Sequence, residues 1–171
     1  MTCKELGINE SAFYQAIRSF NGADKRLELL GKNNYTAVYK DFAHSPSKLK
    51  ATIEAVKQQY PDRKLISVME LHTFSSLDKD FLKQYKGSMD ITDEAIVFID
   101  KHTFSQKRIE PYGEEEVKIA FGNEKLKFFN NPEILVRFLF GINYKGKNLL
   151  LMSSGNFAGI DLNELTINVL K

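Results

Sequence analysis

The chain has 171 residues, 43% of them hydrophobic and 27% charged, which is typical of one globular domain with a buried core. A net charge of +2 without a basic block argues against a nucleic-acid surface, and no apolar run is long enough to span a membrane. The single cysteine, Cys3, excludes an internal disulfide framework and, with a start that lacks a signal peptide, indicates a cytoplasmic protein or a piece of one.

The first elements predicted along the chain are a short helix and a pair of strands. Residues 9–20 predict the helix, with Asn9 as its N-cap and one apolar stripe. Gly22 interrupts this pattern, so we expect a boundary there and interpret residues 1–21 as the end of something upstream. Two short strands around a turn at 31–34 follow before residue 44. The predicted stripe of the helix consists of Phe13, Ala16, Ile17 and Phe20.

From Ser45 onward, predicted helices and strands alternate. Ser45 is the expected N-cap of the first of these helices, and Pro46 is at its first position. Such alternation predicts an α/β fold with a mostly parallel sheet covered by helices on both faces. In these sheets, ligands bind at the carboxyl ends of the strands. The predicted helices are 45–60, 78–85, 113–121, 131–139 and 162–170, and the predicted strands are 64–69, 94–99, 126–129 and 148–152.

The three histidines of the chain recur at the ends of predicted strands. Each also has an acidic residue just before it: His44 with Asp41, His72 with Glu70, and His102 with Asp100. Parallel strands would bring all three to one edge of the sheet. Ordinary surface histidines and turn-stabilising acids are the alternative interpretation. We expect no metal site, because the offsets are irregular and no helix carries two histidines four residues apart.

The sequence lacks the common catalytic signatures. It has no G-x-x-x-x-G-K-[ST] phosphate loop, no G-x-G-x-x-G after a strand and no G-x-S-x-G elbow. The segment 153–159, SSGNFAG, follows the last predicted strand, and its small residues would let backbone approach a ligand closely. A plain strand-to-helix turn explains the same composition, so both interpretations stay open.

Two stretches carry a resemblance to a known family. Residues 20–28, with Phe20, Gly22 and the run Lys25 to Glu28, precede a strand that ends in Asp41-Phe-Ala-His44-Ser-Pro46 and leads into a helix. This pattern resembles the start of the C-terminal domain of the Mur ligases, the ATP-dependent amide ligases that build the peptidoglycan stem peptide. Lys25 replaces the more usual arginine. The resemblance implies a Rossmann-like domain and covers essentially the whole chain.

Two later motifs are similar to particular branches of this family. Residues 70–76, ELHTFSS, resemble a loop of the muramate–alanine ligases and of the murein-peptide recycling ligases, and residues 150–161 are most similar to the recycling branch. That branch joins UDP-N-acetylmuramate to L-Ala-γ-D-Glu-meso-diaminopimelate in peptidoglycan recycling. Both branches usually carry an arginine in the first loop, whereas Thr73, Ser75 and Ser76 occur here. The group that holds the carboxylate of the incoming peptide is therefore not identified.

The resemblance also implies roles for individual residues. Arg26, Asp41 and His44 would bind ATP. The catalytic groups would lie in a central ATPase domain that holds most of the ATP and Mg²⁺ contacts, and residues 1–21 would be the tail of that domain. Residues 22–171 would be the C-terminal domain, working with its own central and N-terminal domains. The implied substrate-binding residues are His72, Thr73, Ser75, Ser153, Asn156 and Phe157.

Two alternatives remain open at this point. The chain could be the C-terminal domain of a UDP-N-acetylmuramate–L-alanine ligase or another Mur-type ligase. It could also belong to another class, as a stand-alone nucleotide-binding module. A phosphate loop encoded upstream of Met1 would favour a ligase, and a true start at Met1 would favour the module.

Overall fold

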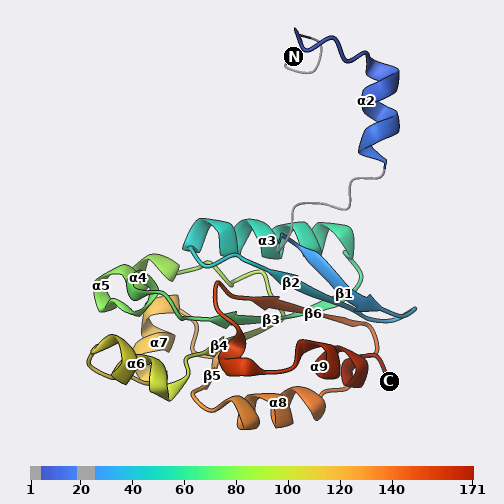
Figure 1. Ribbon diagram of the computed structural model, residues 1–171. Helices are drawn as coiled ribbons and strands as arrows, with labels where there is room; N and C mark the ends of the chain where they lie inside the picture. Colours follow the sequence, from blue (N-terminus) through green and yellow to red (C-terminus); the bar gives the residue numbers. More distant parts are fainter. Residues whose placement is uncertain (1–4, 19–25) are drawn as a thin grey trace.

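One mixed sheet forms the centre of the structure, a computed structural model that describes residues 5–18 and 26–171 (Figure 1). Cys3, Phe20, Gly22 and Lys25 lie outside the described residues. The strand order is β1-β2-β6-β3-β4-β5, in which β1 is antiparallel to β2 and all other pairs are parallel. The strands are β1 (Glu28–Lys32), β2 (Ala37–Asp41), β3 (Lys64–Glu70), β4 (Glu94–Phe98), β5 (Lys127–Phe129) and β6 (Lys147–Met152).

Helices cover both faces of this sheet. In Figure 1, α3 (Pro46–Gln59) lies above the sheet, and α8 (Pro132–Phe140) and α9 (Leu162–Val169) lie below it. The predicted mostly parallel α/β architecture is therefore confirmed. Five further elements contribute to the core on the α3 side of the sheet. They are α4 (Phe74–Leu77), α5 (Lys79–Leu82), the 3₁₀ turn η1 (Lys83–Tyr85), α6 (Lys101–Lys107) and α7 (Glu114–Phe121).

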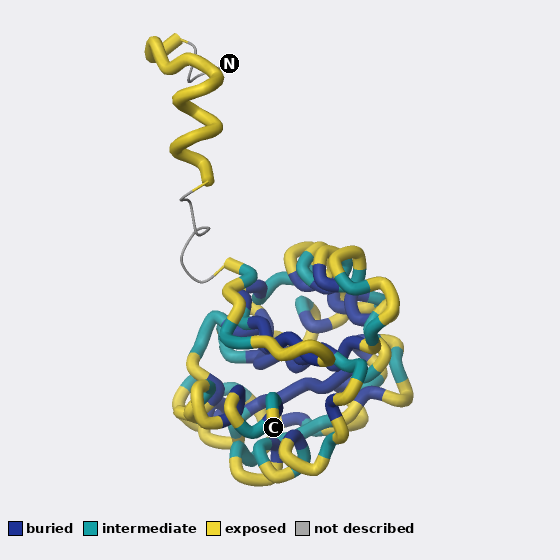
Figure 2. Tube along the Cα trace, turned by 90° about the vertical axis from the view of Figure 1, so that its right-hand side faces the viewer, coloured by how far each residue is buried: buried dark blue, intermediate teal, exposed yellow. Residues whose placement is uncertain are grey.

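The strands supply side chains alternately to two apolar cores, one on each face, because successive residues of a strand point to opposite sides. In β3, Leu65 and Met69 pack into the core under α3, while Ile66 and Val68 pack into the core over α8 and α9. Figure 2 shows the buried trace concentrated in the sheet and on the inner sides of the helices. Both faces of the sheet are thus dry, which explains why β3 reads as an almost continuous apolar run.

The register brings three strand ends to one level. Met152 of β6 is opposite Asp41 of β2 on one side and opposite Met69 of β3 on the other. Ser153 continues this line, and its N–H donates to the carbonyl oxygen of Asp41 over 3.0 Å. The expectation that Asp41 and Ser153 lie at the same edge of the sheet is confirmed.

The helix predicted at the start is present as α2 (Glu10–Ile17), and the side chain of Asn9 caps it by accepting from the Ala12 N–H over 2.8 Å. No residue of α2 is buried, and it stands apart from the sheet in Figures 1 and 2. Phe13 and Ile17, from its apolar stripe, are 38% and 44% exposed. That residues 1–21 end a preceding domain stays a prediction.

Several local details differ from the sequence prediction. Ser45 occupies the N-cap position of α3, but its side chain makes no capping bond. His102 lies in the first turn of α6 rather than in an open loop. Strand β1 extends through Lys32, and the turn is closed by Asn33, whose side chain accepts from the N–H groups of Tyr35 and Thr36. The turn therefore begins later than the predicted 31–34, and Asn33 stabilises it through these bonds to the backbone.

Candidate functional site

The loops that follow β3 and β6 diverge to opposite faces of the sheet. After β3 the chain passes to α4, on the side of α3, whereas after β6 it passes through the 3₁₀ turn η2 (Phe157–Gly159) to α9. Since β3 and β6 are neighbours, the sheet has a topological switch point between their carboxyl ends. In open α/β sheets such a switch point is where ligands bind.

Glu70, the last residue of β3, is buried at this switch point and holds the loop after β6 in place. Its Oε2 accepts hydrogen bonds from the Ser153 hydroxyl and, over 2.9 Å, from the backbone N–H of Phe157. The Ser153 hydroxyl oxygen in turn accepts from the Gly155 N–H over 2.7 Å. Glu70 is 3% exposed and Ser153 2%. One carboxylate therefore fixes the start and the middle of the segment 153–159.

Gly155 lets this loop lie directly on Glu70 and His72. A Cβ atom at position 155 would be 2.8 Å from Oε2 of Glu70 and 3.0 Å from Cγ of His72. Both distances are shorter than an ordinary contact, so only glycine fits without a shift. The predicted substrate-binding residues His72 and Ser153 are thus brought together, with Glu70 between them.

Phe157 has a different place from the one that a substrate-binding side chain would need. Phe157 is 1% exposed, and its phenyl ring packs in the core between the sheet and the helices α8 and α9. Its backbone, at φ 52°, and that of Ala158, at φ 54°, are left-handed, which is costly for residues other than glycine. The hydrogen bond to Glu70 and the buried ring hold this conformation.

Asp41 fastens the chain at the end of β2 in a similar way. Its Oδ2 accepts from the Leu27 N–H over 2.6 Å, and its Oδ1 accepts from the Ala43 N–H over 2.7 Å and from the Thr52 hydroxyl over 3.2 Å. Leu27 is also left-handed, at φ 41°. A carboxylate offers about four acceptor positions, so one position on Oδ2 remains.

A cavity of about 180 Å³ lies beside Asp41. It brings Arg26 and Asp41 together, two of the three residues predicted to bind ATP, and adds Lys48 from the first turn of α3. Two cations and one carboxylate give this cavity a net positive charge, which suits phosphate oxygens. Its volume admits only part of a nucleotide. The full set of lining residues is Arg26, Asp41, Phe42, Ala43, Lys48, Ala51 and Thr52.

His44 does not line this cavity but lies next to it. Its ring meets that of Phe42 edge-on at 5.2 Å between centroids, and its Nδ1 lies 2.9 Å from the Phe42 carbonyl oxygen. The Tyr85 hydroxyl donates to the carbonyl oxygen of His44 over 2.5 Å, and burial raises the pKa of Tyr85 to about 12. The loop between β2 and α3 is thereby tied to η1.

Two of the remaining predicted residues serve the local fold. The Thr73 hydroxyl caps α4 by accepting from the Ser76 N–H over 3.0 Å, and it lies 3.1 Å from the hydroxyl of Ser75. Asn156 is exposed, next to the left-handed turn. Within residues 5–18 and 26–171, no three His, Cys, Asp or Glu side chains are grouped so that they could hold a metal ion.

Sequence reasoning missed two residues of this edge. Glu70 was noted only as the acid before a histidine, and its bond to Phe157 depends on the neighbouring position of β3 and β6. Lys48 looks like an ordinary exposed residue of a helix. A spacing signal for it exists, because a residue two positions after an N-terminal proline stays in the first helical turn, close to the preceding strand end.

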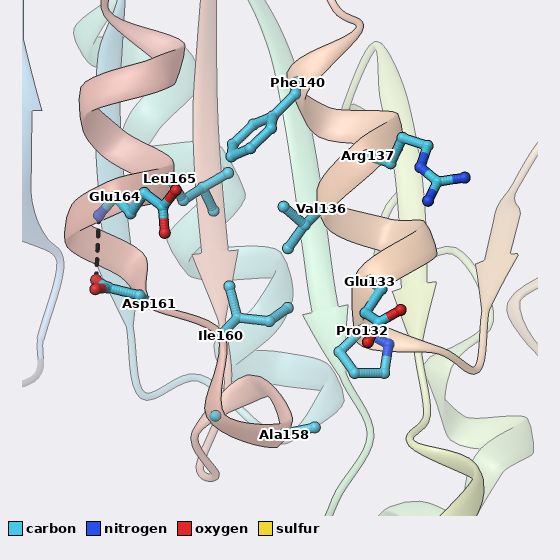
Figure 3. A pocket seen from close by; sticks show the side chains of 11 residues that line it. Pro132, Glu133, Val136, Arg137, Phe140, Ala158, Ile160, Asp161, Glu164 and Leu165 are labelled. Atoms are coloured by element: carbon cyan, nitrogen blue, oxygen red, sulfur yellow. Dashed lines mark hydrogen bonds between the residues drawn. The ribbon is translucent and has the colours of Figure 1, made fainter.

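A larger groove lies between α8 and α9, away from these residues (Figure 3). It has a volume of about 530 Å³, and its apolar lining is provided by Val136, Phe140, Ile160 and Leu165. Asp161 stands at one side, where its carboxylate caps α9. None of the residues predicted to bind ATP or substrate lines this groove. In the described part of the chain, no helix has the length and apolar character to cross a membrane.

Comparison with known proteins identifies the domain. A family model described as Mur ligase, glutamate ligase domain, matches residues 25–155. Among curated proteins, the UDP-N-acetylmuramate–L-alanine ligase of Desulfitobacterium hafniense (strain Y51) is 30% identical over 95 residues, which are 56% of this chain and 21% of that ligase. The chain thus spans about a fifth of this relative.

Solved structures give the same fold. The murein peptide ligase of Psychrobacter arcticus 273-4 matches with a TM-score of 0.66 and 21% identity, over 93% of this chain and 35% of that one. A domain assigned to a UDP-N-acetylmuramate:L-alanyl-γ-D-glutamyl-meso-diaminopimelate ligase of Haemophilus ducreyi 35000HP matches with a TM-score of 0.60 and 26% identity, over 84% of this chain and 99% of that domain. Since the family model covers most of its length, this chain belongs to the Mur ligase family and carries that family's glutamate ligase domain.

Proposed function

We propose that this chain is the C-terminal domain of an ATP-dependent amide ligase that joins UDP-N-acetylmuramate to L-Ala-γ-D-Glu-meso-diaminopimelate. The observation that carries the nucleotide half of this proposal is the cavity of Arg26, Asp41 and Lys48 at the carboxyl ends of the strands. Its small volume suits a domain that closes over a nucleotide held mainly by another domain. Residues 1–21 would then be the tail of that central domain.

Different residues of the cavity would contact different parts of the nucleotide. Arg26 and Lys48 would neutralise phosphate oxygens, for which fixed cations are suited. The remaining acceptor position of Asp41 would take a ribose hydroxyl, and His44 would contact the nucleotide from the neighbouring loop. In such a ligase, ATP activates the muramate carboxylate so that an amine can displace phosphate. The Mg²⁺ that accompanies ATP would be held mainly outside this domain.

The amine substrate would approach the switch point between the carboxyl ends of β3 and β6. His72, Ser153 and Asn156 belong to the two loops that border it. Thr73 caps the helix that follows His72, and Ser75 lies in that helix. The loop 70–77 contains no arginine that would grip a carboxylate close to the amine. A small amino acid depends on such a grip more than a tripeptide, which has further contacts, so this favours the tripeptide.

A second candidate is a ligase that adds free L-alanine, which the names of the curated relatives favour. The two candidate functions are distinguished by kcat/KM of the complete enzyme for L-alanine and for the tripeptide, with UDP-N-acetylmuramate as the carboxylate substrate. We expect a preference of about tenfold or more for the tripeptide, because losing one charge-assisted hydrogen bond costs free alanine about 1.5–3 kcal/mol. A preference for L-alanine would select the second candidate.

The nucleotide half is tested on the chain itself. Titration with ATP, followed by backbone amide NMR, should shift the resonances of Arg26, Ala43 and Lys48, and Arg26→Ala should weaken the binding. Because the phosphate loop is not in this sequence, the chain alone should bind ATP without hydrolysing it. Steady Mg²⁺-dependent phosphate release that is lost on Asp41→Ala would contradict this assignment.

A further inference from the structure

Glu70 is a buried carboxylate without a cation beside it. It is 3% exposed, and it takes part in none of the ion pairs formed among residues 5–18 and 26–171. Glutamates are rarely buried this deeply unless a positive charge accompanies them, because an isolated buried charge is costly. Apart from the neighbouring ring of His72, no basic side chain of the described residues is paired with Glu70.

The two oxygens of Glu70 are used unequally. Oε2 accepts from the Ser153 hydroxyl and from the Phe157 N–H. Oε1 makes no hydrogen bond with the described part of the chain. Its surface is not completely covered by other atoms. One oxygen is thus fixed by the protein, while the other is not fully enclosed. Its acceptor positions are available to a donor that comes from outside.

The position of Oε1 in the fold indicates where a ligand would bind it. It belongs to the last residue of β3, between His72 and the segment 153–159, at the point where the loops after β3 and β6 separate. This is a topological switch point, the kind of place at which open α/β sheets hold their ligands. A negative charge at this place attracts ammonium groups and disfavours carboxylates.

We propose that Oε1 of Glu70 binds the ammonium group at the N-terminus of the incoming peptide and so selects and orients the amine substrate. This inference rests on the proposed function, since it names a residue that would hold one of the ligase's substrates. Glu70 would have two roles: Oε2 positions the loop 153–159, and Oε1 contacts the ligand. A purely structural Glu70 would have only the first.

The test uses the 171-residue chain and two peptides that differ at one group. The probes are L-Ala-γ-D-Glu-meso-diaminopimelate and its form acetylated on the alanine nitrogen, which has no ammonium there. Binding is followed by the amide resonances of Gly155 and Phe157. We expect saturable shifts with the free peptide and binding at least about tenfold weaker with the acetylated peptide, as for the loss of one charge-assisted hydrogen bond.

Variants separate the two roles of Glu70. Glu70→Gln keeps a carbonyl oxygen for Ser153 and Phe157 but removes the charge, so it should weaken the free peptide about tenfold or more while the amide spectrum of the loop stays close to that of the wild type. Glu115→Gln, at an exposed position on α7, removes the same charge elsewhere and should leave binding unchanged. If Glu70→Gln does not fold, the comparison of the two peptides on the wild-type chain decides alone.

The outcomes also distinguish this inference from the proposed function. Equal affinity for the two peptides, or no binding of either at millimolar concentration, overturns the role of Glu70, whatever ATP does. If ATP shifts Arg26 and Lys48 in those same samples, the proposed function stands without this inference. If ATP binds nowhere but the free peptide still depends on Glu70, the ammonium site stands and the nucleotide half of the proposed function fails.

Discussion

The backbone N–H of Phe157 donates to Oε2 of Glu70 across 87 positions of sequence, over a distance of 2.9 Å. This bond joins the ends of the neighbouring strands β3 and β6, and it holds Phe157 in a left-handed conformation at φ 52°. The carboxylate thus does for the loop what a glycine at position 157 would do by its own flexibility, while allowing a phenyl ring to fill the core.

Removing the carboxylate should therefore release the loop. We expect Glu70→Ala to lower the free energy of unfolding by about 3 kcal/mol, because it leaves the Ser153 hydroxyl and the Phe157 N–H without an acceptor in a buried place. Urea denaturation of the variant and of Glu115→Ala, an exposed control, measures this. A loss no greater than that of the control would mean that the loop does not depend on Glu70.

Closing the space at Gly155 tests the same contact from the other side. A Cβ there would be 2.8 Å from Oε2 of Glu70 and 3.0 Å from Cγ of His72, so Gly155→Ala should cost about 1–3 kcal/mol and shift the amide resonance of Phe157. Gly141→Ala is the control, because its Cβ would be 3.4 Å from the nearest atom and its φ of −77° is open to alanine. Equal stability of the two variants would contradict the close approach.

Lys48 should contribute to nucleotide binding although its sequence context does not mark it. It lines the cavity together with Arg26 and Asp41. We expect Lys48→Ala to weaken ATP binding about fivefold at low salt, with a smaller effect at high salt because screening reduces the contribution of an exposed charge. Isothermal titration of Lys48→Ala and of Lys50→Ala, an exposed α3 residue outside the cavity, provides the comparison. Equal losses of ATP affinity in the two variants would mean that Lys48 acts only through the overall charge of the surface and not through its position in the cavity.

Asp93 gives the fold a pH-dependent contribution. Partial burial acts to raise the pKa of Asp93, but hydrogen bonds from Lys57 Nζ and the Leu65 N–H, each 2.8 Å long, outweigh it and lower that pKa. A lowered pKa in the folded state means that Asp93 stabilises the protein above its unfolded pKa of about 3.9. This contribution is lost as the pH falls through the folded value.

We therefore expect Asp93→Asn to be less stable than the wild type at pH 7 by about 1 kcal/mol or less, since both partners are partly exposed. The difference should shrink as the pH falls below about 4. Urea denaturation of both proteins between neutral and acidic pH follows it, with Asp62→Asn as an exposed control. A difference in stability that grows at acidic pH would contradict a lowered pKa of Asp93 in the folded state.

The sequence was sufficient to predict the mostly parallel sheet and to place the candidate site residues at one edge of it. Alternating elements imply parallel strands, and parallel strands put Asp41, His72 and Ser153 at one edge whatever the strand order. The order itself, in which β6 lies between β2 and β3, depends on long-range pairing that no local pattern encodes. The contact of Glu70 with Phe157 follows from that order and so could not be predicted.

The other differences between the prediction and the structure concern individual side chains. The ring of Phe157 was expected beside the substrate, but burial in the core stabilises a phenyl ring more than partial exposure at a loop. The Ser45 side chain was expected to cap α3, and it makes no capping bond although its residue begins the helix. We find no physical reason for this in its surroundings. The domain boundary near Gly22 stays a prediction.

The bond from Leu27 to Asp41 has a mechanical consequence. Asp41 faces the cavity and at the same time holds the left-handed turn through which the chain enters β1. A ligand that pulls on this carboxylate also pulls on the backbone torsion of Leu27, and a rotation at Leu27 moves the carboxylate. Ligand binding at Asp41 would therefore be coupled to the backbone conformation at the entry to β1 through a single side chain.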